Sequence, residues 1–256
     1  MQDLFSIAGK TALVTGGSRG IGRMIARGYV EQGTKVYICS RKEQVCDETA
    51  AELSEYGECI SLPADLSRMD EVERLAAELG EREPRLDILV NNAGATWGAT
   101  IDDFPEKGWD KVMDLNVKSV FFLTQKLLGL LEAGASAEDP ARVINIGSID
   151  GLHTPVFENF SYSPSKAAVH HLTRMTATHL AARGITVNAI APGPFETPML
   201  APMIAQMGDR LRAGVPLGRF GEPPDMAGLA IFLASPASAF LTGAVIPLDG
   251  GIMAAS

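Results

Sequence analysis

The chain of 256 residues is long enough for one large domain with a buried core, and its composition of 46% hydrophobic and 21% charged residues is ordinary for a globular protein. Its formal charge of −9 at pH 7 is spread along the sequence, which argues against nucleic acid and anionic membranes as partners, because both require a basic surface. The sequence contains no run of eighteen apolar residues, so it predicts no transmembrane helix.

The cysteine and histidine patterns suggest neither disulfides nor metal. Cys39, Cys46 and Cys59 form no CxxC pair, so we expect reduced thiols in a cytoplasmic protein. The N-terminus has neither a basic n-region nor an apolar h-region, so no secretory signal is expected. His170 and His171 are adjacent and would point apart on a helix, and no histidine spacing typical of metal ligands occurs, so we expect no metal site.

In chain order, short apolar and β-branched runs alternate with helical patterns. The first half predicts strands at 11–15, 35–39, 59–62 and 86–90, with helices from the glycine-rich turn at 16–22 to about 33, at 44–56 and at 69–83. The second half predicts helices at 109–131, 162–183 and about 224–233, with strands at 142–146, 185–190 and 244–248. This alternation implies right-handed crossovers and an α/β, Rossmann-type fold: a doubly wound, seven-stranded parallel sheet with helices on both faces. No linker or long repeat interrupts it, so we expect one domain over 1–256.

A glycine-rich turn joins the first strand to the first helix. Gly16, Gly20 and Gly22 have the spacing GxxxGxG. Glycines at this position let the backbone approach a phosphate, which the N-terminus of the helix then stabilises. A tight strand-to-helix connection without a ligand is the alternative interpretation.

Tyr162 and Lys166 are four residues apart, so they share one face of the predicted helix. A phenol with a pKa of about 10 is a poor proton donor at neutral pH. An ammonium about 4–5 Å away would favour phenolate by about 3–4 kcal/mol at an effective dielectric of ~20, or two to three pKa units. We therefore expect Lys166 to lower the pKa of Tyr162; a surface pair that shares a helix by chance is the alternative.

Several motifs occur in order along the whole chain. They are residues 15–22, Asn91-Asn92-Ala93-Gly94, Asn116, Ser148, Tyr162 with Lys166, Pro192-Gly193 with Thr197, 241–244 and 249–251. Together they resemble the short-chain dehydrogenase/reductase family, within which the chain is most similar to 3-oxoacyl-thioester (β-ketoacyl) reductases, including the rhamnolipid-associated branch.

This resemblance implies four catalytic residues. Tyr162 would protonate the carbonyl oxygen, and Lys166 would lower its pKa and hold the nicotinamide ribose. Ser148 would hydrogen-bond the substrate carbonyl, and Asn116 would hold a water in the proton relay. Without the resemblance, Ser148 could simply cap a turn at a strand end and Asn116 could occupy a helix kink.

The resemblance also implies a dinucleotide site. Its residues would be Gly16, Ser18, Arg19, Gly20, Ile21, Gly22, Arg41, Asp65, Leu66, Asn91, Asn92, Ala93, Gly94, Tyr162, Lys166, Pro192, Gly193 and Thr197. Within this set, Asp65-Leu66 would contact adenine, 91–94 would line the groove, and Pro192, Gly193 and Thr197 would lie by the carboxamide. The second strand is followed by Ser40-Arg41 rather than by a carboxylate, and Arg19 lies in the glycine-rich turn. Two cations suit a 2′-phosphate, so we expect NADP(H); two solvated surface arginines are the alternative.

Two segments are candidates for the substrate site. The interval from Ser148 to Tyr162 is fourteen residues, one more than the family usually has, and 153–160 could line an acyl pocket with Phe157 and Phe160 or simply pack as a loop. The stretch at about 194–215 would be a mobile lid. Its methionines, Met199, Met203 and Met207, would form an adaptable apolar wall or pack against the domain.

The expected partners are a small-molecule substrate and other copies of the chain. Arg183 matches a basic residue with which carrier-dependent members bind an acidic acyl carrier protein, but the loop at 132–139 is acidic and would weaken that docking. Acyl carrier protein is therefore a doubtful partner, and a coenzyme A thioester or a free ketone is at least as suitable. The resemblance implies a homotetramer or homodimer.

We therefore expect an NADPH-dependent oxidoreductase that reduces a ketone, a 3-oxoacyl thioester above all, to a secondary alcohol. The alternatives are an alcohol, sugar or steroid dehydrogenase on the same scaffold, or a non-catalytic nucleotide sensor, because fold alone does not fix function.

Overall fold

The computed structural model describes residues 3–155 and 157–255, and these form one seven-stranded, fully parallel sheet. The strand order is β3-β2-β1-β4-β5-β6-β7. The strands are β1 (Thr11–Thr15), β2 (Lys35–Cys39), β3 (Cys59–Ser61), β4 (Ile88–Asn91), β5 (Ala141–Ile146), β6 (Ile185–Pro192) and β7 (Val245–Leu248). The order reverses between β1 and β4, which is where doubly wound sheets open a ligand crevice at the carboxyl ends of their strands. The predicted fold class is confirmed.

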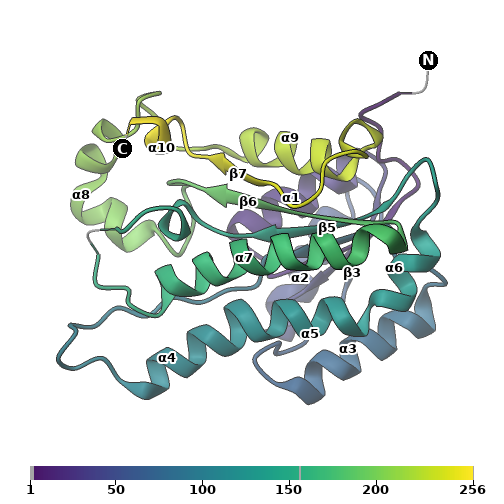
Figure 1. Cartoon of the computed structure of the whole chain (residues 1–256), viewed down its shortest axis with the longest axis horizontal. Coiled ribbons are helices and arrows are strands. Elements are labelled where there is room, and N and C mark those ends of the chain that lie inside the picture. Colours follow the sequence, from purple (N-terminus) through teal and green to yellow (C-terminus); the bar gives the residue numbers. More distant parts are fainter. Residues whose placement is uncertain (1–2, 156, 256) are drawn as a thin grey trace.

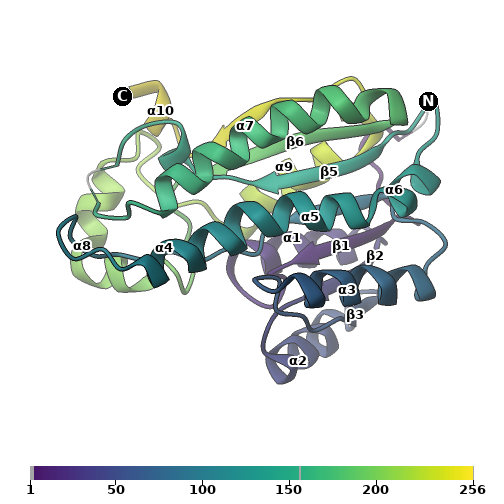
Figure 2. The same ribbon diagram turned by 60° about the horizontal axis from the view of Figure 1, so that its bottom comes forward.

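Helices cover both faces of the sheet (Figures 1 and 2). One apolar core packs the sheet against α1 (Gly20–Glu31), α2 (Glu43–Leu53) and α9 (Pro223–Ala234). The other packs it against α3 (Met69–Arg82), α5 (Ser119–Lys126) and α7 (Tyr162–Leu180). The remaining helices are α4 (Glu106–Met113), α6 (Leu128–Gly134), α8 (Ala201–Ala213) and α10 (Ile252–Ala255). Within the described ranges, no helix combines the length and apolar character needed to cross a membrane.

The central strands are continuous hydrophobic runs because both of their faces are covered. Every residue of β1, β4, β5 and β6 is buried. The three cysteines are buried and free, as the absence of a CxxC pair predicted.

The helix predicted at 109–131 is not continuous. After α4 the chain forms a π-helical segment, Asp114–Lys118, before α5, and a second break at Leu127 precedes α6. The side chain of Asn116 explains the first break: its Oδ1 accepts from the N–H of Ala95 at 2.8 Å, and its Nδ2 donates to the carbonyl of Ala95 at 3.0 Å. A short π segment inside an α-helix often marks a functional site.

The segment at 194–215 contains a helix that the sequence pattern did not predict. None of the residues of α8 is buried, and Met207 departs from helical geometry with φ −145° and ψ 30°. Met199 is half exposed. Met203 and Met207 are partly buried, so an adaptable apolar wall and packing against the domain both remain predictions. Both views show α8 at the end of the molecule opposite the N-terminus (Figures 1 and 2).

Candidate active site

The residues expected from the sequence gather at one edge of the sheet. The glycine-rich turn follows β1, Arg41 follows β2, and Asp65 and Leu66 follow β3. Residues 92–94 follow β4, which ends at Asn91, Ser148 follows β5, and Gly193 follows β6, which ends at Pro192. Because all strands are parallel, their carboxyl ends meet at this edge. The parallel topology therefore brings together motifs that are far apart in the sequence.

The glycine-rich turn is too closely packed for side chains. Gly16 has φ +65°, and a Cβ there would lie 2.7 Å from Nδ2 of Asn92. A Cβ on Gly22 would lie 2.8 Å from the carbonyl carbon of Gly16. Helix α1 begins at Gly20, and the preceding residue, Arg19, makes no side-chain cap to its N–H groups. An uncapped helix N-terminus behind a bare glycine turn fits a phosphate of a dinucleotide.

Thr15, the last residue of β1, ties this turn to β4, a role that we did not predict. Its hydroxyl donates to the carbonyl of Val90 at 3.2 Å and accepts from the N–H groups of Asn92 at 2.9 Å and Ala93 at 3.0 Å. Nδ2 of Asn92 donates in turn to the carbonyl of Thr15 at 2.8 Å. The signal in the sequence was a small hydroxyl residue at the end of an apolar strand.

Arg19 and Arg41 lie at neighbouring points of this edge. The N–H of Gly17, two residues before Arg19, donates to the carbonyl of Cys39, two residues before Arg41, at 3.2 Å. Both guanidinium groups are exposed, and neither forms an ion pair within residues 3–155 and 157–255. They remain available to an anion.

The other expected cofactor residues have varied surroundings. Asp65 accepts hydrogen bonds from the backbone and hydroxyl of Ser67, and Leu66 is buried. The amide of Asn91 faces the core, where it donates to Thr124 at 3.1 Å and Asn145 at 2.9 Å, so its side chain does not line the groove.

A Cβ on Gly20 would be 3.4 Å from Thr197, which places the start of the segment at 194–215 beside the glycine-rich turn. Gly193 donates its N–H to Leu248, so the end of β6 is fixed to β7.

Asn116, Gly94 and Lys166 converge below this turn. A Cβ on Gly94 would lie 3.3 Å from Oδ1 of Asn116 and 3.8 Å from Nζ of Lys166. Nδ2 of Asn116 also donates to the hydroxyl of Ser165 at 2.9 Å, which links the π-helical segment to α7. The buried Asn116 thus holds the loop after β4 against the first turn of α7.

Tyr162 and Lys166 share one face of α7, as the spacing predicted. Nζ of Lys166 lies 5.5 Å from the centre of the Tyr162 ring and donates to the carbonyl of Ile146 at 2.8 Å. The expected lowering of the tyrosine pKa is wrong for this structure. Burial raises the pKa of Tyr162 to about 12, and the nearby charge of Asp150 raises it further, whereas a hydrogen bond with Ser148 opposes the change. Burial also lowers the pKa of Lys166 to about 8. The sequence identified the pair, but the effect of burial on the two pKa values could not be predicted from it.

Ser148 follows β5 and caps the short 3₁₀ helix Ile149–Gly151, with its hydroxyl accepting from the N–H of Asp150 at 3.2 Å. Asp150 was not among the expected site residues. Its carboxylate accepts from Nδ2 of Asn159 at 3.2 Å, and burial raises its pKa. The hydroxyl of Ser163 donates to the carbonyl of Asp150, so the loop that carries Ser148 is joined to the first turn of α7, with a carboxylate two residues beyond the serine.

The segment at 153–160 contains the expected apolar side chains. Phe160 packs edge-on against Phe104, with ring centroids 5.9 Å apart, and it is partly exposed. Nε2 of His153 lies 4.0 Å from Oδ1 of Asp150. Val156, which belongs to the same expected wall, lies outside the described residues. An acyl pocket here remains a prediction.

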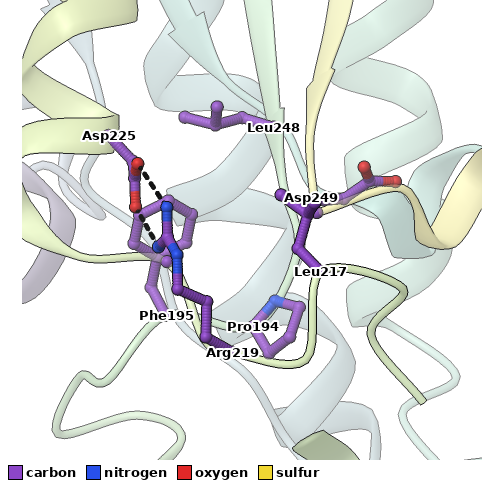
Figure 3. A pocket seen from close by; sticks show the side chains of 9 residues that line it. Pro194, Phe195, Leu217, Arg219, Asp225, Leu248 and Asp249 are labelled. Atoms are coloured by element: carbon purple, nitrogen blue, oxygen red, sulfur yellow. Dashed lines mark hydrogen bonds and ion pairs between the residues drawn. The ribbon is translucent and has the colours of Figure 1, made fainter. Parts of the chain in front are cut away.

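Two hollows are lined by residues of the segment at 194–223. One, of about 70 Å³, is shown in Figure 3, where Arg219 and Asp225 form a two-pronged ion pair with N–O distances of 2.6 and 3.0 Å. Its other labelled walls are Pro194, Phe195, Leu217, Leu248 and Asp249. The second, of about 410 Å³, extends from Arg219 to Met24 of α1.

Comparisons with known proteins agree with this geometry. Residues 16–253 match the family model described as enoyl-(acyl carrier protein) reductase. The rhamnolipids biosynthesis 3-oxoacyl-[acyl-carrier-protein] reductase of Pseudomonas aeruginosa is 53% identical over 253 residues, covering 98% of this chain and 99% of that protein. The short-chain dehydrogenase/reductase PhomF of Diaporthe leptostromiformis is 35% identical, covering 97% and 93%.

Among solved structures, the Pseudomonas aeruginosa RhlG/NADP active-site complex superposes with a TM-score of 0.95 at 53% identity, covering 98% of this chain and 99% of that chain. The ordered motifs, the parallel sheet and these matches lead to one conclusion: the chain belongs to the short-chain dehydrogenase/reductase family.

Proposed function

We propose that the protein is an NADP(H)-dependent oxidoreductase that reduces the ketone of a 3-oxoacyl thioester to a secondary alcohol. The observation that carries this proposal is that Tyr162 and Lys166 share one face of α7, whose first turn is hydrogen-bonded to the loop that carries Ser148. The 53% identity to a 3-oxoacyl reductase over nearly the whole chain supports the substrate class. Two unpaired cations, Arg19 and Arg41, suit the 2′-phosphate of NADP(H).

The residues divide the reaction between them. NADPH, when bound, supplies the hydride to the ketone carbon. Tyr162 gives its phenolic proton to the carbonyl oxygen, and its high pKa keeps that proton in place at neutral pH. Ser148 donates a hydrogen bond to the same oxygen and stabilises the charge that develops on it. The resulting tyrosinate lies beside Lys166, whose ammonium stabilises it until a proton returns from solvent.

In this scheme Asn116 links the loop after β4 to α7 and takes part in returning a proton to Tyr162. Both hydrogens of its amide are already donated, to Ala95 and Ser165. A relay water would therefore bind the remaining lone pair of Oδ1 or the main-chain carbonyl.

The carrier of the acyl group is a separate question. The name of the Pseudomonas aeruginosa relative refers to acyl carrier protein. Here Nε of Arg183 donates to the carboxylate of Glu132, which lies in α6, at the start of the acidic stretch at 132–139. The one cation that resembles a carrier-docking residue is thus already paired. We therefore propose that coenzyme A thioesters, or free ketones, are used in preference to carrier-protein thioesters.

We further propose a cytoplasmic homotetramer or homodimer, a single domain over 1–256, and a lid at about 194–215. Apolar side chains are exposed on α5 (Phe121), α7 (Met175) and before β7 (Phe240), which are the surfaces expected to associate. Light scattering at micromolar concentration would distinguish the assembly states.

The function is tested by following nicotinamide oxidation with NADPH and NADH in parallel, using acetoacetyl-CoA, a longer 3-oxoacyl-CoA and the matching carrier-protein thioester. We expect turnover with NADPH and the CoA thioesters, and a loss of orders of magnitude in Tyr162→Phe with nearly unchanged NADPH binding. Unchanged turnover in that variant would contradict the mechanism. Turnover of free ketones alone would identify an alcohol, sugar or steroid dehydrogenase. NADPH binding without turnover of any substrate would indicate a nucleotide sensor.

A further inference from the structure

We propose that Asp150 is a specificity-determining residue: its negative charge beside the reacting carbonyl excludes 3-oxo carboxylates and admits uncharged 3-oxo esters and thioesters. The inference rests on the proposed function, because it concerns which 3-oxo compounds reach Ser148 and Tyr162.

The carboxylate is fixed next to the reacting groups. The N–H of Asp150 donates to the hydroxyl of Ser148 at 3.2 Å, the same hydroxyl that is proposed to hold the substrate carbonyl. The hydroxyl of Ser163, the residue after Tyr162, donates to the carbonyl of Asp150. The side chain is held by Asn159, whose Nδ2 donates to Oδ2 at 3.2 Å. Asp150 is thus tied to Ser148 on one side and to the first turn of α7 on the other.

The charge is only partly compensated on the substrate side. The buried Lys166 forms no ion pair with Asp150 in the described part of the chain, and its Nζ donates instead to the carbonyl of Ile146 at the strand end. The side chain of Asp150 is 21% exposed, in the loop that leads into the expected substrate wall. His153 approaches Oδ1 only at 4.0 Å and neutralises it only when protonated. The carboxylate lies within about 8 Å of the Ser148 hydroxyl, because only the short side chain separates it from the N–H that donates to that hydroxyl.

The chemistry of the substrate then decides binding. In a 3-oxo acid the carboxylate carbon is two bonds from the ketone carbon, so a carbonyl held by Ser148 brings a second negative charge within several ångströms of Asp150. Repulsion between unit charges about 7 Å apart at an effective dielectric of ~20 weakens binding by tenfold to a hundredfold. A thioester or ester carries no charge at that position and meets no such repulsion.

The test compares acetoacetate with its ethyl ester in the wild type and in Asp150→Asn, which keeps the size of the side chain and an acceptor for Asn159. We expect the ratio of kcat/KM for the anion to that for the ester to rise at least tenfold in the variant. The matched control is Asp103→Asn, which removes the same charge from an exposed position before Phe104 and should change the ratio less than twofold.

Binding provides a readout that does not depend on turnover. Calorimetry of the dead-end complexes with NADP⁺ gives dissociation constants for the anion and the ester, and their ratio should shift as the kinetic ratio does. A ratio that stays within twofold in Asp150→Asn, by binding or by kinetics, overturns the inference, as does an equal shift in Asp103→Asn. If the wild type binds both ligands but reduces neither, the proposed function has failed while the binding ratio still decides the role of Asp150.

Discussion

The imidazole of His170 fills the space that a side chain on Gly147 would need. A Cβ on Gly147 would lie 2.6 Å from Cδ2 of His170 and closer still to Nε2, and one on Gly151 would lie 2.9 Å from its Cε1. Both glycines bracket Ser148. His170 is 2% exposed, and burial lowers its pKa to about 4, so the ring is neutral. The loop that carries Ser148 is therefore seated on an uncharged imidazole.

This contact predicts coupling between the two positions. Gly147→Ala should lower kcat at least tenfold, because the methyl group must displace either the imidazole or the Ser148 loop. Adding His170→Ala should restore part of that loss by making room, although His170→Ala alone should cost about 2–3 kcal/mol of stability through the cavity it leaves. A double-mutant cycle on kcat and on the free energy of unfolding measures the coupling.

Gly129→Ala in α6 is the matched control, because no atom lies within 4 Å of a Cβ at that position. It should leave kcat unchanged and stabilise the helix by up to about 1 kcal/mol. Additive effects of Gly147→Ala and His170→Ala would contradict a direct contact.

The buried ammonium of Lys166 predicts a dependence of stability on pH. Its pKa falls from 10.5 to about 8 on folding, so between these values the unfolded chain binds more protons and stability rises with pH. Below pH 8 the full cost of burying the charge is present. Lys166→Met should therefore be more stable than the wild type at pH 7, by about 1–2 kcal/mol, and the gap should narrow by pH 10. Urea denaturation at both pH values measures it; a gap of equal size at both would exclude this cause.

The two unpaired arginines predict the cofactor preference. Arg41→Ala or Arg19→Ala should weaken NADPH binding by about tenfold to a hundredfold, the usual worth of a charge-assisted hydrogen bond. NADH lacks the 2′-phosphate, so its affinity should change less than threefold. Fluorescence titration of both nucleotides gives the dissociation constants, and Lys42→Ala, an exposed neighbour of Arg41, is the control. Equal losses for NADPH and NADH would mean that these arginines do not contact the 2′-phosphate.

The ion pair between Glu132 and Arg183 predicts how carrier use can be gained. Glu132→Gln should free Arg183 and lower KM for a carrier-protein thioester twofold to tenfold, while KM for the matching CoA thioester stays constant. The effect should shrink at high salt, because the docking charges are exposed. Equal changes for both carriers would show that the pair does not affect docking.

The exposed helix α8, in the proposed lid, predicts a site of early proteolysis. Arg210 and Arg212 lie in α8, which has no buried residue to resist local unfolding. Trypsin should cut there before it cuts the sheet, and saturating NADPH should slow the cut if the lid closes over the cofactor. Mass spectrometry of the first fragments identifies the site. Cleavage elsewhere first would contradict a loosely held lid.

Features that depend only on neighbours along the chain could be predicted from the sequence. The β-branched runs predicted the strands because period and composition are local, and the spacing of Tyr162 and Lys166 placed both on one helix face. The predicted ends of helices and strands were less accurate. Helix α2 ends at Leu53 rather than near 56, because the hydroxyl of Ser54 bonds to the carbonyls of Ala50 and Cys59.

Features that depend on contacts across the fold escaped the sequence. The carboxylate of Asp150 comes close to the other site residues only when its loop folds onto α7. The ion pair of Glu132 and Arg183 joins residues 51 positions apart. The sign of the Tyr162 pKa shift was wrong because burial, which opposes the lysine charge, is not visible in a local motif. Electrostatic effects of this kind require the completed packing.

The π-helical segment at Asp114–Lys118 makes the site unusually sensitive to chain length. A π turn holds one residue more than an α turn, so deleting a single residue there would leave a regular and more relaxed helix. A π turn carries its extra residue over nearly the same rotation, so the helices on either side would keep their directions, and only the side chains inside the segment would move. Asn116 would then turn away from Ala95 and Ser165. Insertions and deletions should therefore be rare in this segment among active relatives, even though the backbone could accommodate them. Substitutions on the exposed face of the segment should be tolerated.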